Sequence, residues 1–248
     1  MKFNICIAIQ IKSGSIEENE IIIKRAKYEK PEFIELRFDY INDINLISED
    51  FVNALISAIQ PEVSAIFTFR DPSEGGQINI SEKERVEIIK TLIKSKPKYL
   101  DIEINNDTEI LSEVINLASQ NKISLIFSFH DFQKTPSSDE CITTINAFEN
   151  RLINDLKIDS EFLEKCIYKA IFTAQNFEDN FVPLNVCKTF SKKGQKIICF
   201  CMGEIGIFSR IICVKAGSYL TFGSIDEKTA PGQLNIKKIR EIHQLLFE

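Results

Sequence analysis

A lysine and a histidine in this sequence have the types and settings needed for covalent and acid–base chemistry. Lys169 lies inside an apolar run over residues 166–172. Burial disfavours the charged ammonium, and a neutral amine is a nucleophile toward a carbonyl carbon. His130 directly follows another apolar run, 123–129, and an imidazole accepts and returns protons near neutral pH. The pair favours attack of an amine on a carbonyl, with proton transfer beside it.

Both residues also have a structural interpretation. Lys169 could instead be neutralised by a neighbouring carboxylate, with Glu103 as the candidate, and its own run leaves the two interpretations equally open. A histidine at the end of a strand is more often a hydrogen-bonded structural residue, so the catalytic interpretation of His130 depends on Lys169. His243, near the end of the last helical pattern, is interpreted as structural because a cation suits the helix dipole there.

An acidic residue could assist the histidine. Glu74 follows Arg70 closely, on a loop that contains Gly75 and Gly76. We expect its carboxylate to hydrogen-bond His130, fix the tautomer of the ring and raise its basicity.

Further charged residues stand in or just after six successive apolar runs. A buried ion has a high desolvation cost unless it is paired, so this repetition needs a reason. For Asp39, Asp101 and Glu103 we favour a structural ion-pair network over a catalytic role. The other candidates on these runs and on the loops after them are Glu35, Arg37, Arg70, Arg210, Thr229 and Gln233.

Eight short, apolar, β-rich runs alternate with helical patterns along the chain. The runs show little polar alternation, as expected for parallel strands buried on both faces. Among the helix signals are a cap at Ser48 and a capping box of Ser81 with Glu84. The last helical pattern places these residues on one apolar face: Ile236, Ile239, Ile242, Leu245 and Leu246. The predicted strands cover residues 3–11, 33–38, 64–70, 99–104, 123–129, 167–173, 196–202 and 219–222.

This order of elements predicts an α/β fold, a (βα)8 TIM barrel that forms a single domain over residues 1–248. A doubly wound open sheet is the competing architecture, but no Gly-rich dinucleotide loop follows the first run. Catalytic groups of a barrel lie at the C-terminal ends of its strands. We therefore expect the candidates above to meet at one mouth.

Composition narrows the function classes. The net charge of −6 and the scattered lysines argue against a nucleic-acid partner. The seven cysteines are odd in number and irregularly spaced, which predicts neither disulfides nor a metal site. No signal peptide is expected, and no apolar run approaches the ~20 residues of a membrane helix. A cytoplasmic enzyme that does not act at a membrane is the default expectation.

Seven short segments, in order over nearly the whole chain, resemble class I 3-dehydroquinate dehydratases. They are ELRFD at 35–39, FTFR at 67–70, EGG at 74–76, SFHDFQKTP at 128–136, MGEIGIFSR at 202–210, TFG at 221–223 and APGQ at 230–233. The resemblance implies a TIM barrel that converts 3-dehydroquinate to 3-dehydroshikimate in the shikimate pathway. It also implies no metal, no cofactor and a homodimer.

The resemblance assigns roles to the candidates. Lys169 forms an imine with the C3 ketone, and His130 takes a proton from C2 and then protonates the leaving hydroxyl. Glu74 orients His130. Arg210 pairs with the substrate carboxylate, for which a planar guanidinium is a bidentate match. The remaining contacts to hydroxyls and carboxylate come from Glu35, Arg37, Arg70, Thr229 and Gln233.

This sequence departs from the family pattern at four places. Thr229 stands where serine is usual, and Ala8 replaces a small polar residue that would contact substrate. Little or no N-terminal closing hairpin is expected. The interval of 39 positions from His130 to Lys169 exceeds the usual one, which Lys157 would satisfy. We prefer Lys169 because it lies in a strand-like run, and we expect an insertion between Phe148 and Glu164.

Two other functions compete. A class I aldolase-like barrel also uses a Schiff base, but those that take phosphorylated sugars bind phosphate near strands seven and eight, where Glu204 would repel it. A catalytically silent barrel that binds a shikimate-type acid is the second alternative. The presence of every chemical group argues against it.

Overall fold

One parallel sheet organises the molecule, which we describe from a computed structural model over residues 3–225, 227 and 229–247. Within these residues the sheet has nine strands in the order β7-β6-β5-β4-β3-β2-β1-β8-β9. The strands are β1 Ile5–Gln10, β2 Phe33–Arg37, β3 Ser64–Thr68, β4 Tyr99–Glu103, β5 Ser124–Asp131, β6 Ile167–Thr173, β7 Ile197–Met202, β8 Thr221–Ser224 and β9 Leu234–Asn235. All eight predicted strands are confirmed, and the two-residue β9 is an addition.

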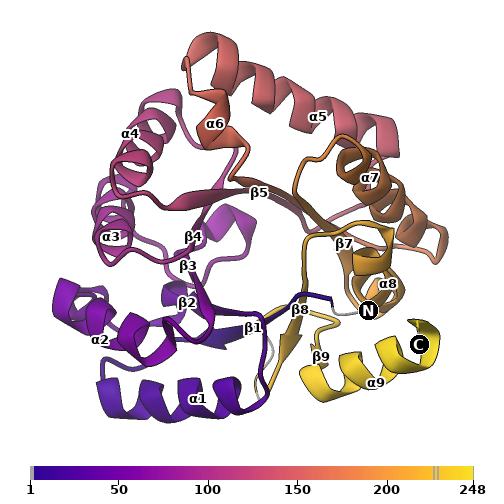
Figure 1. The fold of residues 1–248 in the computed structure, drawn as a ribbon. Coiled ribbons are helices and arrows are strands. Elements are labelled where there is room, and N and C mark those ends of the chain that lie inside the picture. Colours follow the sequence, from indigo (N-terminus) through magenta and orange to yellow (C-terminus); the bar gives the residue numbers. More distant parts are fainter. Residues whose placement is uncertain (1–2, 226, 228, 248) are drawn as a thin grey trace.

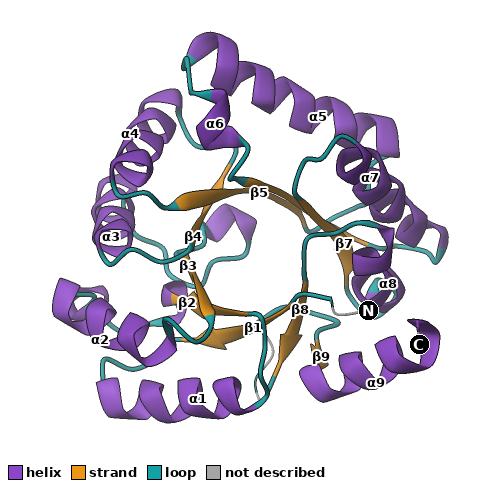
Figure 2. Cartoon of the chain, in the orientation of Figure 1, coloured by secondary structure: helices purple, strands orange, loops and turns teal. Residues whose placement is uncertain are grey.

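The sheet curls so that its strands surround a common centre, with the helices on the outside (Figures 1 and 2). A doubly wound sheet would carry helices on both faces, so that alternative was wrong. Within the described residues no ladder joins β7 to β8, but the backbone N–H of Tyr219 donates to the carbonyl of Ile197 at 2.6 Å. The fold is therefore a curled parallel sheet built from alternating βα units.

The helices follow the predicted signals. They are α1 Ile16–Tyr28, α2 Glu49–Ile59, α3 Glu82–Lys94, α4 Thr108–Gln120, α5 Ser138–Asn150, α6 Ser160–Leu163, α7 Phe181–Lys192, α8 Ile207–Ala216 and α9 Ile236–Phe247. Ser48 accepts a hydrogen bond from the N–H of Phe51, and Ser81 forms the full capping box with Glu84, so both caps are confirmed.

The predicted apolar face of α9 was wrong at its C-terminal end. Leu245 and Leu246 are 84% and 56% exposed. The inward face instead continues from Ile236 and Ile239 to His243, whose Nε2 lies 2.9 Å from the carbonyl of Ile211. Leu245 lies two residues after His243 and therefore on another face, and Leu246 lies in the last turn of the helix. His243 is structural, as expected, but burial lowers its pKa and so disfavours the charged form on which the expected interaction with the helix dipole depended.

Aromatic rings fill the sheet interior at the amino ends of the strands. Phe33 begins β2, Tyr99 begins β4, and Tyr219 precedes β8. Their ring centroids lie 5.9 to 6.4 Å apart. These side chains close that end of the curl with apolar surface and leave the carboxyl ends of the strands for polar groups.

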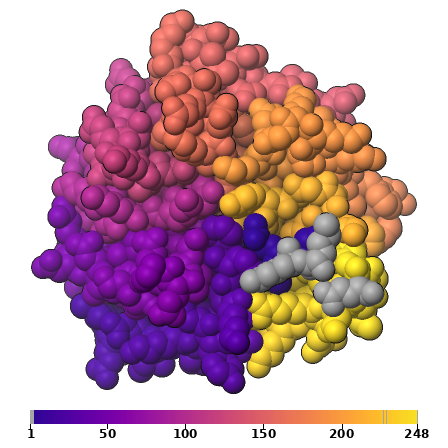
Figure 3. Space-filling model, in the orientation of Figure 1, coloured from indigo at the N-terminus to yellow at the C-terminus, as the bar shows by residue number. Residues whose placement is uncertain are grey.

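The first strand, β1, pairs with β8 from the C-terminal part of the chain. Ile5 pairs with Thr221, and the Asn4 side chain donates to the carbonyl of Tyr219 at 2.9 Å. The C-terminal α9 lies beside the N-terminal segment in the space-filling view (Figure 3). No helix within the described ranges is long and apolar enough to cross a membrane.

Candidate active site

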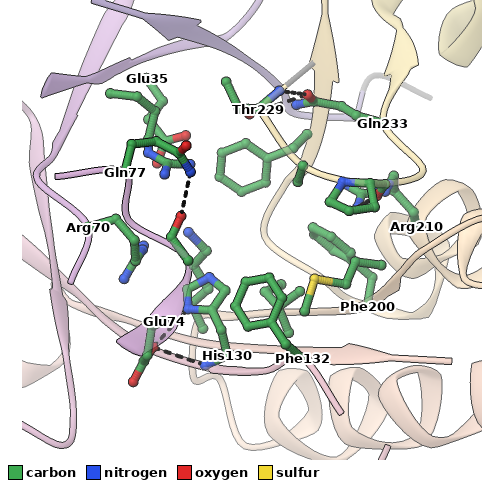
Figure 4. Close-up of a pocket in the computed structure, with 18 of the residues that line it drawn as sticks. Glu35, Arg70, Glu74, Gln77, His130, Phe132, Phe200, Arg210, Thr229 and Gln233 are labelled. Carbon is green, nitrogen blue, oxygen red and sulfur yellow. Dashed lines mark hydrogen bonds and ion pairs between the residues drawn. The ribbon is translucent and has the colours of Figure 1, made fainter. Parts of the chain in front are cut away.

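A cavity of about 470 Å³ opens at the carboxyl ends of the strands, and all nine predicted site residues line it. Figure 4 shows several of them around the cavity. The predicted members are Lys169, His130, Glu74, Glu35, Arg37, Arg70, Arg210, Thr229 and Gln233. The expectation that these residues meet at one mouth is therefore confirmed.

Lys169 projects into the cavity from the middle of β6 and is only 6% exposed. Its Nζ lies 2.8 Å from Oδ2 of Asp101 and 4.9 Å from the centroid of the Phe222 ring. The carboxylate beside the amine is thus Asp101, and the suggestion of Glu103 was wrong. Two guanidinium groups, those of Arg70 and Arg85, already bind Glu103.

Lys157 lies away from this cavity. It is an exposed loop residue with a φ of 54°. The chain between His130 and Lys169 forms α5, a single π-helical turn η4 (Arg151–Asp155) and α6, all outside the curled sheet. The structure brings Lys169, and not Lys157, into the same pocket as His130.

His130 lies near the end of β5 and is bound to Glu74, as predicted. Its ring Nδ1 and its backbone N lie 2.9 Å and 3.1 Å from Oε2 of Glu74. Burial, followed by the positive charges of Arg70 and Lys169, lowers the pKa of His130 well below its ordinary value. The expected bond from Glu74 is therefore present, but burial and the neighbouring cations set the direction of the pKa shift of His130.

The pocket also disfavours the charged form of Glu74. Burial raises the pKa of its carboxyl to about 8, with Arg70 opposing and the carboxylates of Glu103 and Asp101 adding to the rise. The same physical cause acts on both partners, because a desolvated site penalises either ion. These shifts favour a neutral acid beside a neutral imidazole, and a neutral imidazole can accept a proton.

The acidic and basic residues of β2 form compensated contacts. Arg37 donates to both oxygens of Asp39, at 2.7 and 2.8 Å, which confirms the structural interpretation of Asp39. The hydroxyl of Thr68 donates to Glu35 at 2.7 Å. These bonds fix Glu35 and Arg37 where they face the cavity.

Arg70 is the centre of a second network. Its guanidinium lies 2.8 Å from Asp101, 2.6 Å from Glu103 and 2.6 Å from the hydroxyl of Ser128. Burial alone would lower the pKa of Arg70, but the two carboxylates raise it above its ordinary value. For Glu103 a structural role is confirmed by these contacts, while Asp101 joins the network to Lys169.

Arg85 completes that network, although sequence reasoning missed it. It lies on α3, is 3% exposed and contacts Glu103. A signal was available, because Arg85 occupies the same helical face as Ile89 and Leu92, and an arginine on an apolar face needs a buried partner.

Arg210 has a different environment. It is 2% exposed, its guanidinium lies 4.5 Å over the ring of Phe200, and Nη2 donates to the carbonyl of Pro231 at 3.1 Å. Its Nε has no partner, and within the described residues no carboxylate forms an ion pair with it. Burial lowers its pKa to about 10. An unpaired buried cation facing a cavity is suited to an anionic ligand.

The loop between β8 and β9 covers part of the cavity. Thr229 N–H and hydroxyl donate to Oε1 of Gln233 at 2.8 and 3.3 Å, and Gln233 donates to the carbonyl of Gly223 at 3.1 Å. Gly232 has a φ of +72°, and a Cβ there would lie 2.2 Å from the carbonyl oxygen of Gly203. This close approach requires glycine and holds the loop against the segment after β7.

Several lining residues were not predicted. Phe132 stacks on the imidazole of His130, with ring centroids 6.5 Å apart, and Tyr40 donates to the carbonyl of Thr229 at 3.3 Å. The other unpredicted side chains of the lining are Gln77, Ile171, Phe200, Met202, Ala230, Pro231 and Phe222. Most are apolar, and their types carry no chemical signal in sequence. Ala8 is not among the lining residues of this cavity.

The site thus combines a buried lysine, an imidazole with a lowered pKa and a guanidinium that has no carboxylate partner in the described part of the chain. Within the residues described, no group of three or more His, Cys, Asp or Glu side chains is arranged to hold a metal ion.

Known proteins share this arrangement of sequence and fold. The model of the type I 3-dehydroquinase family matches residues 5–248. A 3-dehydroquinate dehydratase of Methanococcus maripaludis is 35% identical over 219 residues, which cover 87% of this chain and 88% of that protein.

Solved structures agree. The type I 3-dehydroquinate dehydratase of Clostridium difficile superposes with a TM-score of 0.80 at 27% identity, covering 99% of this chain and 92% of that one. A 3-dehydroquinate dehydratase of Geobacillus kaustophilus, at 23% identity and a TM-score of 0.82, covers 100% and 93% and supports the fold. The chain therefore belongs to the type I 3-dehydroquinase family of hydro-lyases.

Proposed function

We propose that this protein removes water from 3-dehydroquinate, giving 3-dehydroshikimate, through an imine on Lys169. The observation that carries the proposal is the presence of Lys169 and His130 in one cavity with Arg210, whose guanidinium has no carboxylate partner among the described residues. The reaction is a step of the shikimate pathway, which leads to the aromatic amino acids.

Each step uses a group already described. The ammonium of Lys169 gives up one proton, and the free amine attacks the C3 ketone. The resulting hydroxyl takes up that proton and leaves as water, which gives a protonated imine. This electron sink acidifies the neighbouring C2–H, whose proton passes to neutral His130. The resulting enamine expels the hydroxyl on the adjacent carbon, and His130 returns its proton to that hydroxyl. Water then hydrolyses the imine, which frees the product and regenerates the amine.

His130 acts through Nε2, because its Nδ1 is engaged with Glu74. Glu74 fixes the ring orientation by two bonds, one to the ring and one to the backbone. It is a positioning residue in this proposal. The low pKa of His130 suits the first step, since the ring must be neutral to take the C2 proton.

Arg210 receives the substrate carboxylate. A bidentate carboxylate would satisfy its orphaned Nε and replace its weak contact with a backbone carbonyl. The substrate hydroxyls and part of the carboxylate would meet the remaining polar lining residues, Glu35, Arg37, Arg70, Thr229 and Gln233. Thr229 and Gln233 are hydrogen-bonded to one another, so substrate binding would replace that hydrogen bond with bonds to the substrate.

Borohydride reduction tests the covalent step. In the presence of 3-dehydroquinate, borohydride should reduce the imine to a stable amine adduct, and peptide mapping should place that adduct on Lys169. Lys157→Ala should trap as well as the wild type, because Lys157 is an exposed loop residue. An adduct on Lys157, or full turnover by Lys169→Ala, would overturn the assignment. One relative from Clostridium difficile has been crystallised with covalent modified comenic acid.

The same experiment also tests the proton-transfer role of His130. His130→Ala should still form the adduct but lose turnover by about 10²–10⁴-fold, the usual contribution of a positioned acid or base. Turnover is followed by the ultraviolet absorbance of the conjugated enone. Adduct without enone in the wild type would favour the aldolase-like or the silent, acid-binding alternative.

We also propose the finer features of the architecture and setting. The curl closes into a (βα)8 barrel that forms one domain over residues 1–248, with little or no N-terminal hairpin, supported by the Tyr219–Ile197 bond between β8's leading segment and β7. Seven free, buried cysteines support a reducing cytoplasm. A homodimer stays a prediction from the family resemblance, testable by light scattering.

A further inference from the structure

The two oxygens of Asp101 have separate partners. Oδ1 lies 2.8 Å from Nη2 of Arg70 and accepts from the hydroxyl of Ser128 at 2.6 Å. Oδ2 accepts from Nζ of Lys169 at 2.8 Å. One oxygen therefore anchors the carboxylate to the pocket wall, and the other faces the amine that reacts.

We propose that Asp101 is the counterion of the imine, holding its positive charge and directing its single N–H bond so that the substrate faces His130. This inference rests on the proposed imine mechanism and extends it to a residue that sequence reasoning treated as structural.

The anchoring contacts hold Asp101 as an anion. The side chain is completely buried, and burial alone would raise its pKa, but Arg70 and Lys169 lower that pKa to about 2. Asp101 is consequently a poor proton acceptor near neutral pH. It keeps its charge while the lysine nitrogen changes from ammonium to amine to protonated imine, and its contribution is electrostatic and geometric.

The surrounding charges fix the position of Asp101. The order of contacts is Lys169, Asp101, Arg70, Glu103 and Arg85, with signs that alternate from plus to minus. Each inner member of this series of ion pairs contacts an opposite charge on both sides, so both of its carboxylates are compensated. A carboxylate held at two points reorganises little when the charge beside it changes its chemical form.

Imine formation makes the direction of Oδ2 important. An ammonium has three N–H bonds, whereas the nitrogen of a protonated imine is bonded to Cε, doubly bonded to C3 and has one N–H. If that bond points to Oδ2, the plane of the imine is fixed, and with it the face of C2. Lys169 pairs with Ser128 and His130 pairs with Ile171 in the β5–β6 ladder, so the base lies on the strand next to the imine.

A matched pair of variants tests the assignment. Asp101→Asn removes the charge next to Lys169, and Glu103→Gln removes a charge from the same buried network without touching Lys169. Each is compared with the wild type for the fraction trapped by borohydride during turnover, for kcat and KM, and for unfolding by urea. The last measurement confirms that both variants are folded.

We expect Asp101→Asn to lower both the trapped fraction and kcat by roughly tenfold to a hundredfold, the range for loss of a charge-assisted bond, with KM changed by less than about threefold. Glu103→Gln should change the trapped fraction by less than about threefold. Equal effects of the two variants on trapping would reduce Asp101 to a structural role and overturn the assignment.

A conservative variant covers the case in which Asp101→Asn fails to fold. Asp101→Glu keeps the charge but displaces the carboxylate, so it should trap substrate nearly as well as the wild type and still have a lower kcat. Trapping and kcat both at the wild-type level would show that the position of this carboxylate is unimportant. If the wild type itself gives no adduct, the imine mechanism fails, and this inference fails with it.

Discussion

The two walls of the pocket differ in the partners that they provide for buried charges. The charged wall is formed by Glu35, Arg37 and Arg70 on one side, and each has a polar partner within the protein. That partner is a threonine hydroxyl for Glu35 and a carboxylate for each arginine. The apolar wall, formed by Phe200, Met202, Phe222 and Arg210 on the other, contains a guanidinium with no carboxylate partner within the described residues. Both walls are buried, so the difference lies in the partners and not in access to water.

This contrast distinguishes the paired charges, which position other groups, from the charge of Arg210, which is suited to bind a ligand. A buried ion pair is weak evidence for stability, but removal of one partner leaves an ion with a large desolvation cost. In the charged wall, that cost is offset before substrate arrives. Among the residues that the structure describes, the guanidinium of Arg210 has only a carbonyl and a ring as partners. We therefore expect an apolar residue there to stabilise the protein, and a bound carboxylate to offset the cost of burying the charge.

The largest expected effect comes from breaking a pair in the charged wall. Asp39→Ala leaves Arg37 buried without its bidentate partner. The free energy of unfolding should fall by about 3–5 kcal/mol, which is the usual cost of an orphaned buried charge. Urea unfolding followed by circular dichroism measures it.

The exposed pair of Lys12 and Glu227 provides the control, since its side chains are 54% and 62% exposed at a separation of 2.5 Å. Glu227→Ala should change the unfolding free energy by no more than about 1 kcal/mol. A similarly small change in Asp39→Ala would mean that the charged wall is not held by its ion pairs.

The apolar wall should respond in the opposite way. Arg210→Met removes an unpaired charge and keeps much of the volume, so the unfolding free energy should stay the same or rise. Turnover should suffer, with kcat/KM lower by about 100-fold, or about 2.7 kcal/mol, because the substrate carboxylate loses its charged partner. Steady-state kinetics and urea unfolding on one preparation give both values.

Arg37→Met is the matched variant in the charged wall, and it should lose stability because Asp39 becomes an orphaned anion. If Arg210→Met were destabilised to the same degree as Arg37→Met, Arg210 would have a structural partner in solution and the contrast between the walls would be wrong.

Sequence reasoning located both walls because their main signals are local. Parallel strands buried on both faces appear as short apolar runs, and a charge at the end of such a run, as in Arg37 or Arg70, is unusual enough to notice. The rule that barrel chemistry gathers at the carboxyl ends then placed Lys169, His130 and Arg210 together, which the cavity lining confirms.

The pairing of the charges was beyond the sequence, because it depends on competition in three dimensions. Glu103 was the suggested partner of Lys169. In the structure, Arg85 on α3 binds Glu103, and the amine of Lys169 binds Asp101 instead. The rotation of a helix decides such a contact, and a shift of one residue in its face would remove it. The same kind of rotation in α9 exposed Leu245, which the apolar pattern had predicted to be buried.

The direction of the net pKa shift of His130 was also unpredictable. A carboxylate bound to an imidazole normally favours the charged ring. Here the burial of both groups outweighs the bond, and the cations Arg70 and Lys169 oppose a further positive charge on the ring. The depth of a cavity depends on the whole fold, so it cannot be predicted from the spacing of a few residues in the sequence.

The smallest expected effect concerns this pair, at the border of the two walls, and it appears in the pH dependence of stability. Glu74 has a pKa of about 8 in the folded protein against an ordinary value of 4.5. Between these values the folded state binds more protons than the unfolded state, so its stability falls as the pH rises. The contribution is complete below about 4.5 and is lost above about 8.

Glu74→Gln isolates this contribution, because its amide has a similar shape and no proton to lose in this range. Between pH 6.5 and 7.5 the wild-type unfolding free energy should fall by about 1 kcal/mol more than that of the variant. His130 has the opposite effect on stability, because its lowered pKa makes the free energy of unfolding fall as the solution is acidified below about pH 6.5. The pH range chosen here lies at or above that value. Parallel slopes in urea titrations of the two proteins would mean that Glu74 is already ionised in the folded state, and the charged wall would then extend across the pocket to His130.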